Sequence, residues 1–155
     1  AWDVEDAFGH VQGTVSGFFT PGSDDRYPTL ALRAGGKKVF GTHPFHEAAY
    51  IGGDDNVRGL REERFAGDAA VFGNAELRLP LSRFSLLFPT EFGLHGAADL
   101  GRVFFDGDPN DADDWHTAIG GGIWISLLDR IQTVSISVMR GEDMTAFYLK
   151  AGMHF

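Results

Sequence analysis

Apolar and polar residues alternate with a period of two along most of this chain, and helical periodicity is almost absent. A period of two places successive side chains on opposite faces of a β-strand. The pattern predicts seven strands, at residues 7–19, 29–37, 70–81, 84–105, 116–127, 132–139 and 147–155. A short break is expected at Ser82 and Arg83, and the strand that follows is expected to bend at Pro89. A long irregular loop is expected from about 41 to 68.

The apolar face of each predicted strand is backed by a polar face that carries charged residues: Arg33, Lys37, Glu76, Arg78, Asp99 and Lys150. A soluble barrel or sandwich encloses its apolar face, whereas a membrane barrel turns that face to lipid and lines its lumen with the polar one. Alternation alone fits both architectures. The connections favour the membrane barrel, because short turns lie at one end of the strands and longer loops at the other.

Composition narrows the class of protein further. The 155 residues are 43% hydrophobic and carry a net charge of -9, which argues against nucleic acid as a partner. The 21 glycines and 14 phenylalanines suit a tightly curved sheet better than a helical bundle. No apolar run is long enough for a transmembrane helix, but a transmembrane strand needs only about 9–11 residues.

The expected fold is therefore all-β, a single domain over residues 1–155. It is an antiparallel transmembrane β-barrel of the outer-membrane type, with about seven to eight strands in this chain and the long loop directed into the lumen. Bacterial barrels have even strand numbers, and an open edge is not viable in lipid. Closure thus requires earlier strands, an eighth strand that includes residues 2–6, or another copy of this chain or a different chain.

Several polar motifs are weak signals of chemistry. The segment THPFHEAAY is not a zinc motif, and Pro44 disfavours a helix there, so a loop without metal is expected. The segment DGDPNDADDW lacks the glycine and glutamate of a calcium loop and is expected to be a solvated loop. Glycines 35–36 and 120–122 lie within strands and indicate bends or close packing. Trp115, Trp124 and Tyr148 fit an interfacial aromatic girdle or a core equally well.

One block of sequence resembles a known family. The residues VRGL at 57–60, followed by FAGDAAVFGNAELRLPL at 65–81, are similar to the C-terminal barrel of the BamA/TamA superfamily, the bacterial surface-antigen proteins. Members insert or export proteins at the outer membrane. Their signature is an Arg-Gly pair at the tip of a long extracellular loop that folds back into the barrel. The resemblance covers residues 40–155.

The resemblance implies a latch inside the barrel. It implies that Arg58 pairs with Asp99, which lies in the stretch AADLG that matches the family's acidic inner-wall pattern. Arginine in a narrow lumen needs a carboxylate with matching fork geometry, and Gly59 permits a tight turn. Glu76, which matches a recurrent inward glutamate, is expected to share this site.

The chain departs from the family pattern at two positions. Leu60 follows Val57, Arg58 and Gly59 where an aromatic residue is expected, and Ala97 stands where a phenylalanine is expected. Both residues would pack near the loop tip. Phe155 matches the terminal phenylalanine of a barrel-assembly signal, although the spacing of the preceding glycine is unusual.

The resemblance implies a protein of the bacterial outer membrane that inserts, assembles or translocates proteins and is not an enzyme. Implied partners are outer-membrane lipid or lipopolysaccharide, client or passenger proteins, and other copies of the chain; no cofactor or metal is expected. Two alternatives stay open. One is a membrane anchor for an N-terminal enzyme domain, and the other is a small ligand-binding β-barrel without an insertase role.

Overall fold

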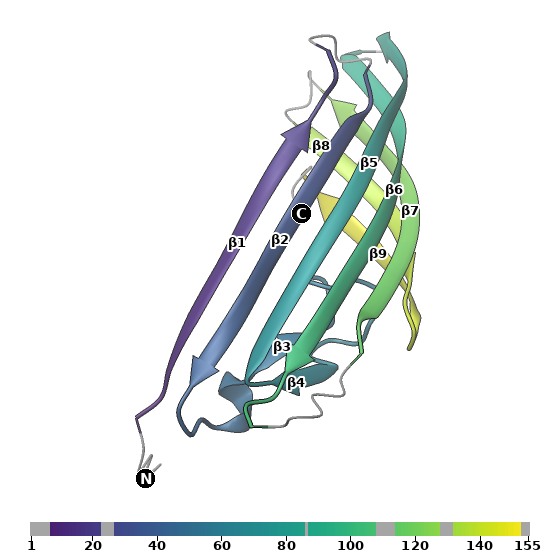
Figure 1. The fold of residues 1–155 in the computed structure, drawn as a ribbon. Helices are drawn as coiled ribbons and strands as arrows, with labels where there is room; N and C mark the ends of the chain where they lie inside the picture. Colours follow the sequence, from purple (N-terminus) through teal and green to yellow (C-terminus); the bar gives the residue numbers. More distant parts are fainter. Residues whose placement is uncertain (1–6, 23–26, 86, 108–113, 128–131, 153–155) are drawn as a thin grey trace.

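The computed structural model describes residues 7–22, 27–85, 87–107, 114–127 and 132–152. Seven strands form one antiparallel sheet in the order β1-β2-β5-β6-β7-β8-β9. The sheet is strongly curved (Figure 1). Its strands are β1 (Gly9–Phe19), β2 (Thr29–Phe40), β5 (Ala69–Ser85), β6 (Pro89–Phe104), β7 (His116–Leu127), β8 (Gln132–Arg140) and β9 (Thr145–Ala151). The all-β antiparallel part of the predicted fold is confirmed.

The connection between β2 and β5 is more ordered than the sequence suggested. Its residues 41–68, called the inward loop below, contain a 3-10 turn η1 (Phe45–Glu47) and a small hairpin. The hairpin pairs β3 (Ala49–Ile51) with β4 (Phe65–Gly67). Strands of three residues are too short to give a visible alternation, which is why the sequence predicted an irregular segment. The hairpin lies at one end of the sheet, on the inside of its curve (Figure 1).

The predicted break at Ser82 and Arg83 is wrong. Strand β5 continues to Ser85, and a register shift between Pro80 and Ser82 lets it stay paired with β6. The extra residue of such a bulge mimics a break in the alternation. Pro89 begins β6 instead of bending a longer strand, since a proline without an N–H group is best tolerated at a strand's first residue.

The sheet is inverted relative to a soluble β-protein. On β6 the aliphatic Leu94 and Leu100 are exposed, whereas His95 and Asp99 between them are buried. The same holds across the sheet, where the outward face is formed by aliphatic side chains such as Val15 (70% exposed), Ile119, Ile136 and Leu149. The inward face buries polar residues: Asn74, Arg78, Glu91, His95, Asp99, Ser126, Thr133 and Ser137.

The buried core lies between the inward loop and the inward face of the sheet. Loop residues Ile51, Val57 and Leu60 pack with sheet residues into one cluster, completed by Val39, Ala49, Ala70, Ala97, Val103, Ala118 and Met139. The core is therefore enclosed by the curve of the sheet, and the loop supplies much of its apolar surface. Nothing in the described part of the chain covers the apolar outward face.

The curved sheet does not close on itself within the described residues. Strand β1 pairs only with β2, and strand β9 only with β8. Closure into a barrel accordingly stays a prediction. Because the seven strands are antiparallel to their neighbours, β1 and β9 run in the same direction. The first residue of β1 and the last residue of β9 therefore lie at opposite ends of the strands. The described residues contain no helix that is long and apolar enough to cross a membrane.

Candidate functional site

Arg58 lies at the tip of the inward loop, between β3 and β4, and is 6% exposed. Its guanidinium forms an ion pair with the carboxylate of Asp99, which is 2% exposed on the inward face of β6. Nε of Arg58 donates to Oδ2 of Asp99 and Nη2 of Arg58 donates to Oδ1, both at 2.8 Å. This is the bidentate geometry typical of strong arginine–carboxylate pairs. The backbone N–H of Arg58 also donates to Oδ2, at 3.0 Å. The structure therefore brings the two residues together by three hydrogen bonds.

Glu76 extends the pair into a network on two adjacent strands. Its Oε2 accepts from Nη1 of Arg58 at 3.3 Å, and its Oε1 accepts from Nε of Arg78 at 2.7 Å. The register places Glu76 opposite Ala97, two residues from Asp99. The two arginines and two carboxylates balance in charge. Because Arg58, Arg78 and Asp99 are buried and the side chain of Glu76 is only 12% exposed, each charge depends on its neighbours for compensation.

The protonation state of Arg58 is fixed by this network. Burial alone would lower the pKa of its guanidinium, because it removes the charged form from water. The hydrogen bonds and negative charges of Asp99 and Glu76 outweigh burial and raise the pKa. Arg58 thus stays charged.

Gly59 continues the loop tip toward the other side of the sheet. Its φ of +83° lies in the left-handed region, which favours glycine. Its N–H donates to the hydroxyl of Tyr148 on β9 at 2.9 Å. A Cβ at this position would come within 2.7 Å of the backbone nitrogen of Gly141, in the β8–β9 turn. Only glycine permits both the turn and this close approach.

Further polar contacts tie the inward loop to β2 and β5. Lys37 donates through Nζ to the carbonyls of Glu47, at 2.8 Å, and Ala48, at 3.1 Å. Asn74 donates through Nδ2 to the carbonyl of Asn56 at 2.6 Å, and Arg33 donates to that of Asp55. Cationic and amide side chains thereby satisfy loop carbonyls that would otherwise be unpaired.

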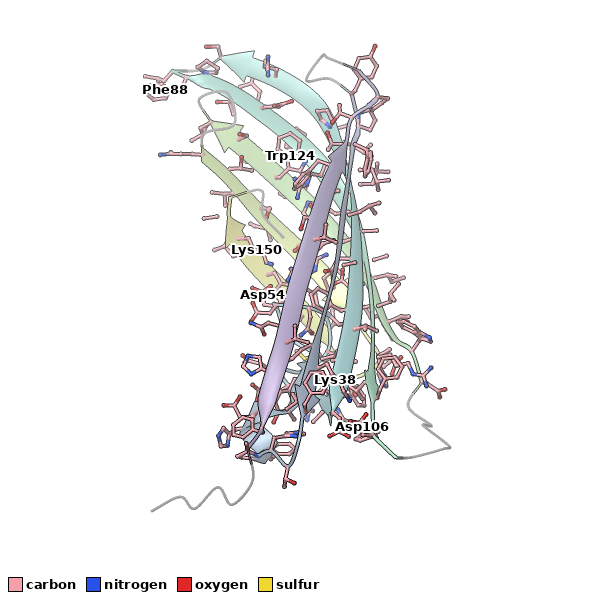
Figure 2. All side chains as sticks on the ribbon, turned by 60° about the vertical axis from the view of Figure 1, so that its left-hand side comes forward. Lys38, Asp54, Phe88, Asp106, Trp124 and Lys150 are labelled. Carbon is pink, nitrogen blue, oxygen red and sulfur yellow. The ribbon has the colours of Figure 1, made fainter. Side chains whose placement is uncertain are left out.

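Two ion pairs tie the same loop to the other side of the sheet. The ammonium of Lys150 on β9 lies 2.8 Å from the carboxylate of Asp54; both residues are labelled in Figure 2. Arg64 lies 2.9 Å from Asp143 in the β8–β9 turn. The loop therefore crosses the inside of the curve from β2 to β9. We call the set Arg58, Gly59, Glu76 and Asp99 the latch.

Leu60 and Ala97, where the family pattern has aromatic residues, belong to the same buried cluster. Ala97 stands opposite Gly120 on β7, and Sδ of Met139 lies within 2.6 Å of where a Cβ of Gly120 would be. Met139 from β8 thus fills space that the small side chains leave. The ring of Tyr148 packs against the cluster as well. The missing aromatic bulk near the loop tip is supplied from β8 and β9.

The remaining predicted residues have mixed outcomes. Trp124 is 2% exposed on the inward face and donates through Nε1 to the carbonyl of Leu94, so it is no part of an outer girdle. Tyr148 is likewise inward, and Trp115 is half exposed. Phe155 and most of the acidic segment at 106–114 lie outside the described residues. Among the residues described, no group of three or more potential metal ligands occurs.

Sequence reasoning did not single out several contacts of the loop. The sequence pattern placed Tyr148 and Lys150 correctly on the polar face. It did not indicate that they contact Gly59 and Asp54, respectively. The ring of His116 stacks on Phe65 at 3.6 Å between centroids, and its Nδ1 lies 3.0 Å from Glu142. These contacts join strands far apart in sequence, which alternation cannot detect.

A cavity of about 870 Å³ lies beside the inward loop, where Asn56, Leu60 and other loop residues line it. Residues of both edge strands line it, Gln12 and Thr14 from β1 and Ala146 and Tyr148 from β9, together with much of the inward loop. The cavity therefore opens in the gap between the two edges of the sheet.

Comparison with known proteins gives no relative for this chain. No family model matches the sequence, and no curated protein or solved structure matches it either. The likeness to the BamA/TamA superfamily thus rests on the residues of the latch and of the strand that follows the loop.

Proposed function

We propose that this protein is a β-barrel of the bacterial outer membrane, of the BamA/TamA kind, which takes part in the insertion, assembly or translocation of proteins. The observation that carries the proposal is the latch: a loop arginine buried in a two-pronged pair with an aspartate on the inward face of an inverted sheet. A soluble loop arginine would be expected to be solvated instead.

The inverted sheet supports a membrane location. Aliphatic side chains cover its outward face over all seven strands, and large exposed apolar surfaces on proteins are normally covered by a partner or by lipid. Strands β1, β2 and β7 are long enough, because they have 11, 12 and 12 residues against the roughly 9–11 required to span a bilayer. The described part of β9 is shorter, with 7 residues. The same exposed face argues against a soluble ligand-binding barrel.

The proposed mechanism is one of binding and strand geometry and not of bond chemistry. The latch holds the inward loop across the concave face, and the two edges of the sheet, β1 and β9, flank the neighbouring cavity. An edge strand presents unpaired N–H and C=O groups that pair readily with another strand. Client segments are proposed to engage the sheet at these edges.

A second candidate function is that of an anchor through which an attached domain is held or exported. The inverted sheet favours it equally, because an anchor needs the same apolar wall. The two candidates differ in what they do to other proteins. An insertase accelerates the folding of unrelated membrane barrels, whereas an anchor does not.

The test is reconstitution into lipid vesicles. Purified protein is expected to need detergent or lipid to stay dispersed, and vesicles that contain it are expected to speed the folding of an added outer-membrane barrel. Asp99→Asn, which keeps the side-chain shape and removes the charge, should abolish the acceleration if the latch positions the loop. Unchanged client folding rates with and without the protein would reject the insertase role and leave the anchor.

A further inference from the structure

The outward face of the sheet carries few charged residues. Among the strand positions that the structure describes, register assigns three to this face: Lys38 on β2, Arg102 on β6 and Arg140 on β8. All three are basic. The chain as a whole is acidic, with 22 acidic and 13 basic residues, so the sign of this set opposes the average.

The three residues, called the basic row below, share one end of the sheet. Lys38 and Arg102 are each the third residue from the end of their strands, and Arg140 is the last residue of β8. Strands β2, β6 and β8 all run toward the end at which the inward loop lies (Figure 1). Figure 2 shows Lys38 near this end. No described strand residue is charged on the outward face at the opposite end.

Each member of the basic row stands on apolar surroundings. Directly across the strand pairs lie Val11 opposite Lys38, Val71 opposite Arg102 and Ile119 opposite Arg140, all three exposed. A cation on a lipid-facing wall is costly at the bilayer midplane and nearly neutral at the interface. The basic row therefore marks the depth at which hydrocarbon gives way to headgroups.

Aromatic rings accompany two of these cations. The guanidinium of Arg102 lies 4.9 Å from the ring centre of Phe104, and Nζ of Lys38 lies 5.8 Å from that of Phe40. Aromatic and long cationic side chains both favour the boundary between apolar and polar layers. The rings hold the charged groups at the rim of the sheet.

We propose that the basic row binds the phosphate groups of lipids in the leaflet at the inward-loop end of the barrel. This inference rests on the proposed membrane location. A planar guanidinium can hold a phosphate through two parallel hydrogen bonds, so Arg102 and Arg140 suit this ligand. The leaflet's phosphates lie at the depth where the row stands.

Within the basic row, the surroundings of Lys38 and Arg140 differ. Lys38 already pairs with Asp106, at 2.5 Å, so its charge is shared within the protein. Next to Arg140, by contrast, the acidic residues of the β8–β9 turn are engaged elsewhere. Glu142 lies against His116, and Asp143 pairs with Arg64.

The experiment compares purified protein in nanodiscs of phosphatidylcholine alone and of phosphatidylcholine mixed with phosphatidylglycerol, at low ionic strength. Its thermal unfolding midpoint is expected to be higher in the anionic discs. Arg102→Gln/Arg140→Gln should reduce this increment to roughly a third, because basic residues near an anionic surface contribute about equally and the variant removes two of the three. Lys38→Gln should reduce it less, and added salt should shrink it in the wild type.

Arg83→Gln is the matched control, because it removes the same charge at the opposite end of the sheet, where Arg83 faces Glu91 on the inward face. This variant should keep the full increment. The proposal is overturned if the double variant keeps it too, or if inorganic phosphate in neutral discs reproduces it. Failure of the membrane proposal is a separate outcome, since the protein would then enter neither kind of disc.

Discussion

The inward loop is attached to the sheet in two places that differ in chemistry. Toward β5 and β6 it is held by a buried charge network in which Arg58, Asp99 and Glu76 satisfy one another. Toward β8 and β9 it is held by a backbone contact at Gly59 and by ion pairs of partly exposed side chains. Buried charges cannot separate without a large desolvation penalty, whereas exposed pairs exchange readily with water. The first attachment is thus permanent in the folded state and the second adjustable.

Loss of the permanent attachment should have the largest effect. Asp99→Ala leaves the Arg58 charge buried without its carboxylate, and the free energy of unfolding in detergent is expected to fall by about 3–5 kcal/mol. Trypsin should then cut faster at Arg61 and Arg64 in the same loop. The double variant Arg58→Met/Asp99→Leu removes both charges and should be less destabilised. Equal protease protection in Asp99→Ala and wild type would show that the pair does not hold the loop.

The backbone contact toward β8–β9 should come next. Gly59→Ala introduces a Cβ in the left-handed region and against Gly141, with an expected loss of about 2–4 kcal/mol in unfolding free energy. Gly107→Ala is the matched control, because Gly107 has the same φ of +83° with nothing within 4 Å of the added Cβ. It should lose about 1–2 kcal/mol. If the two variants unfold alike, the close approach to Gly141 contributes nothing.

The hydroxyl of Tyr148 should have a smaller effect. Tyr148→Phe removes the acceptor of the Gly59 N–H group and is expected to cost about 1 kcal/mol. Hydrogen exchange of the Gly59 amide should accelerate. Tyr50→Phe, which removes a hydroxyl that donates to the carbonyl of Phe45 in the same loop, should leave that amide unchanged. If the Gly59 amide exchanges at the same rate in Tyr148→Phe as in the wild type, the hydroxyl of Tyr148 does not help to hold the loop.

The ion pairs at the adjustable side should contribute least. The side chains of Lys150 and Asp54 are 23% and 57% exposed, and exposed pairs contribute about 0–1 kcal/mol. A double-mutant cycle with Lys150→Gln and Asp54→Asn should give a coupling energy in this range that declines with salt. A coupling as large as that of Arg58 with Asp99 would erase the difference between the two attachments.

Alternation predicted the strands well, because each has one face in contact with a different environment from the other. The bounds of β7 match those expected from the sequence, and Asp99 and Lys150 lie on the predicted face. The pattern failed where it was locally disturbed. The bulge between Pro80 and Ser82 resembles a turn in sequence, and the three-residue strands β3 and β4 give too short a signal.

The latch contacts followed from a resemblance, whereas the attachment to β8 and β9 did not. Gly59 and Gly141 are 82 positions apart in sequence and come close in the structure. Neither has a side chain whose chemistry would indicate the contact. Trp124 shows a second limit. A tryptophan in a strand is consistent with either face, and its burial inside depends on the space that Gly93, its cross-strand neighbour, leaves open.

The odd number of strands that the described residues form restricts what can complete their sheet. Strands β1 and β9 run in the same direction, because six antiparallel steps separate them. One added strand that runs the opposite way can therefore pair antiparallel with both edges. A second copy related by an axis along the barrel would instead meet each edge in a parallel register. The open sheet thus selects its neighbours by chain direction before any side chain is involved.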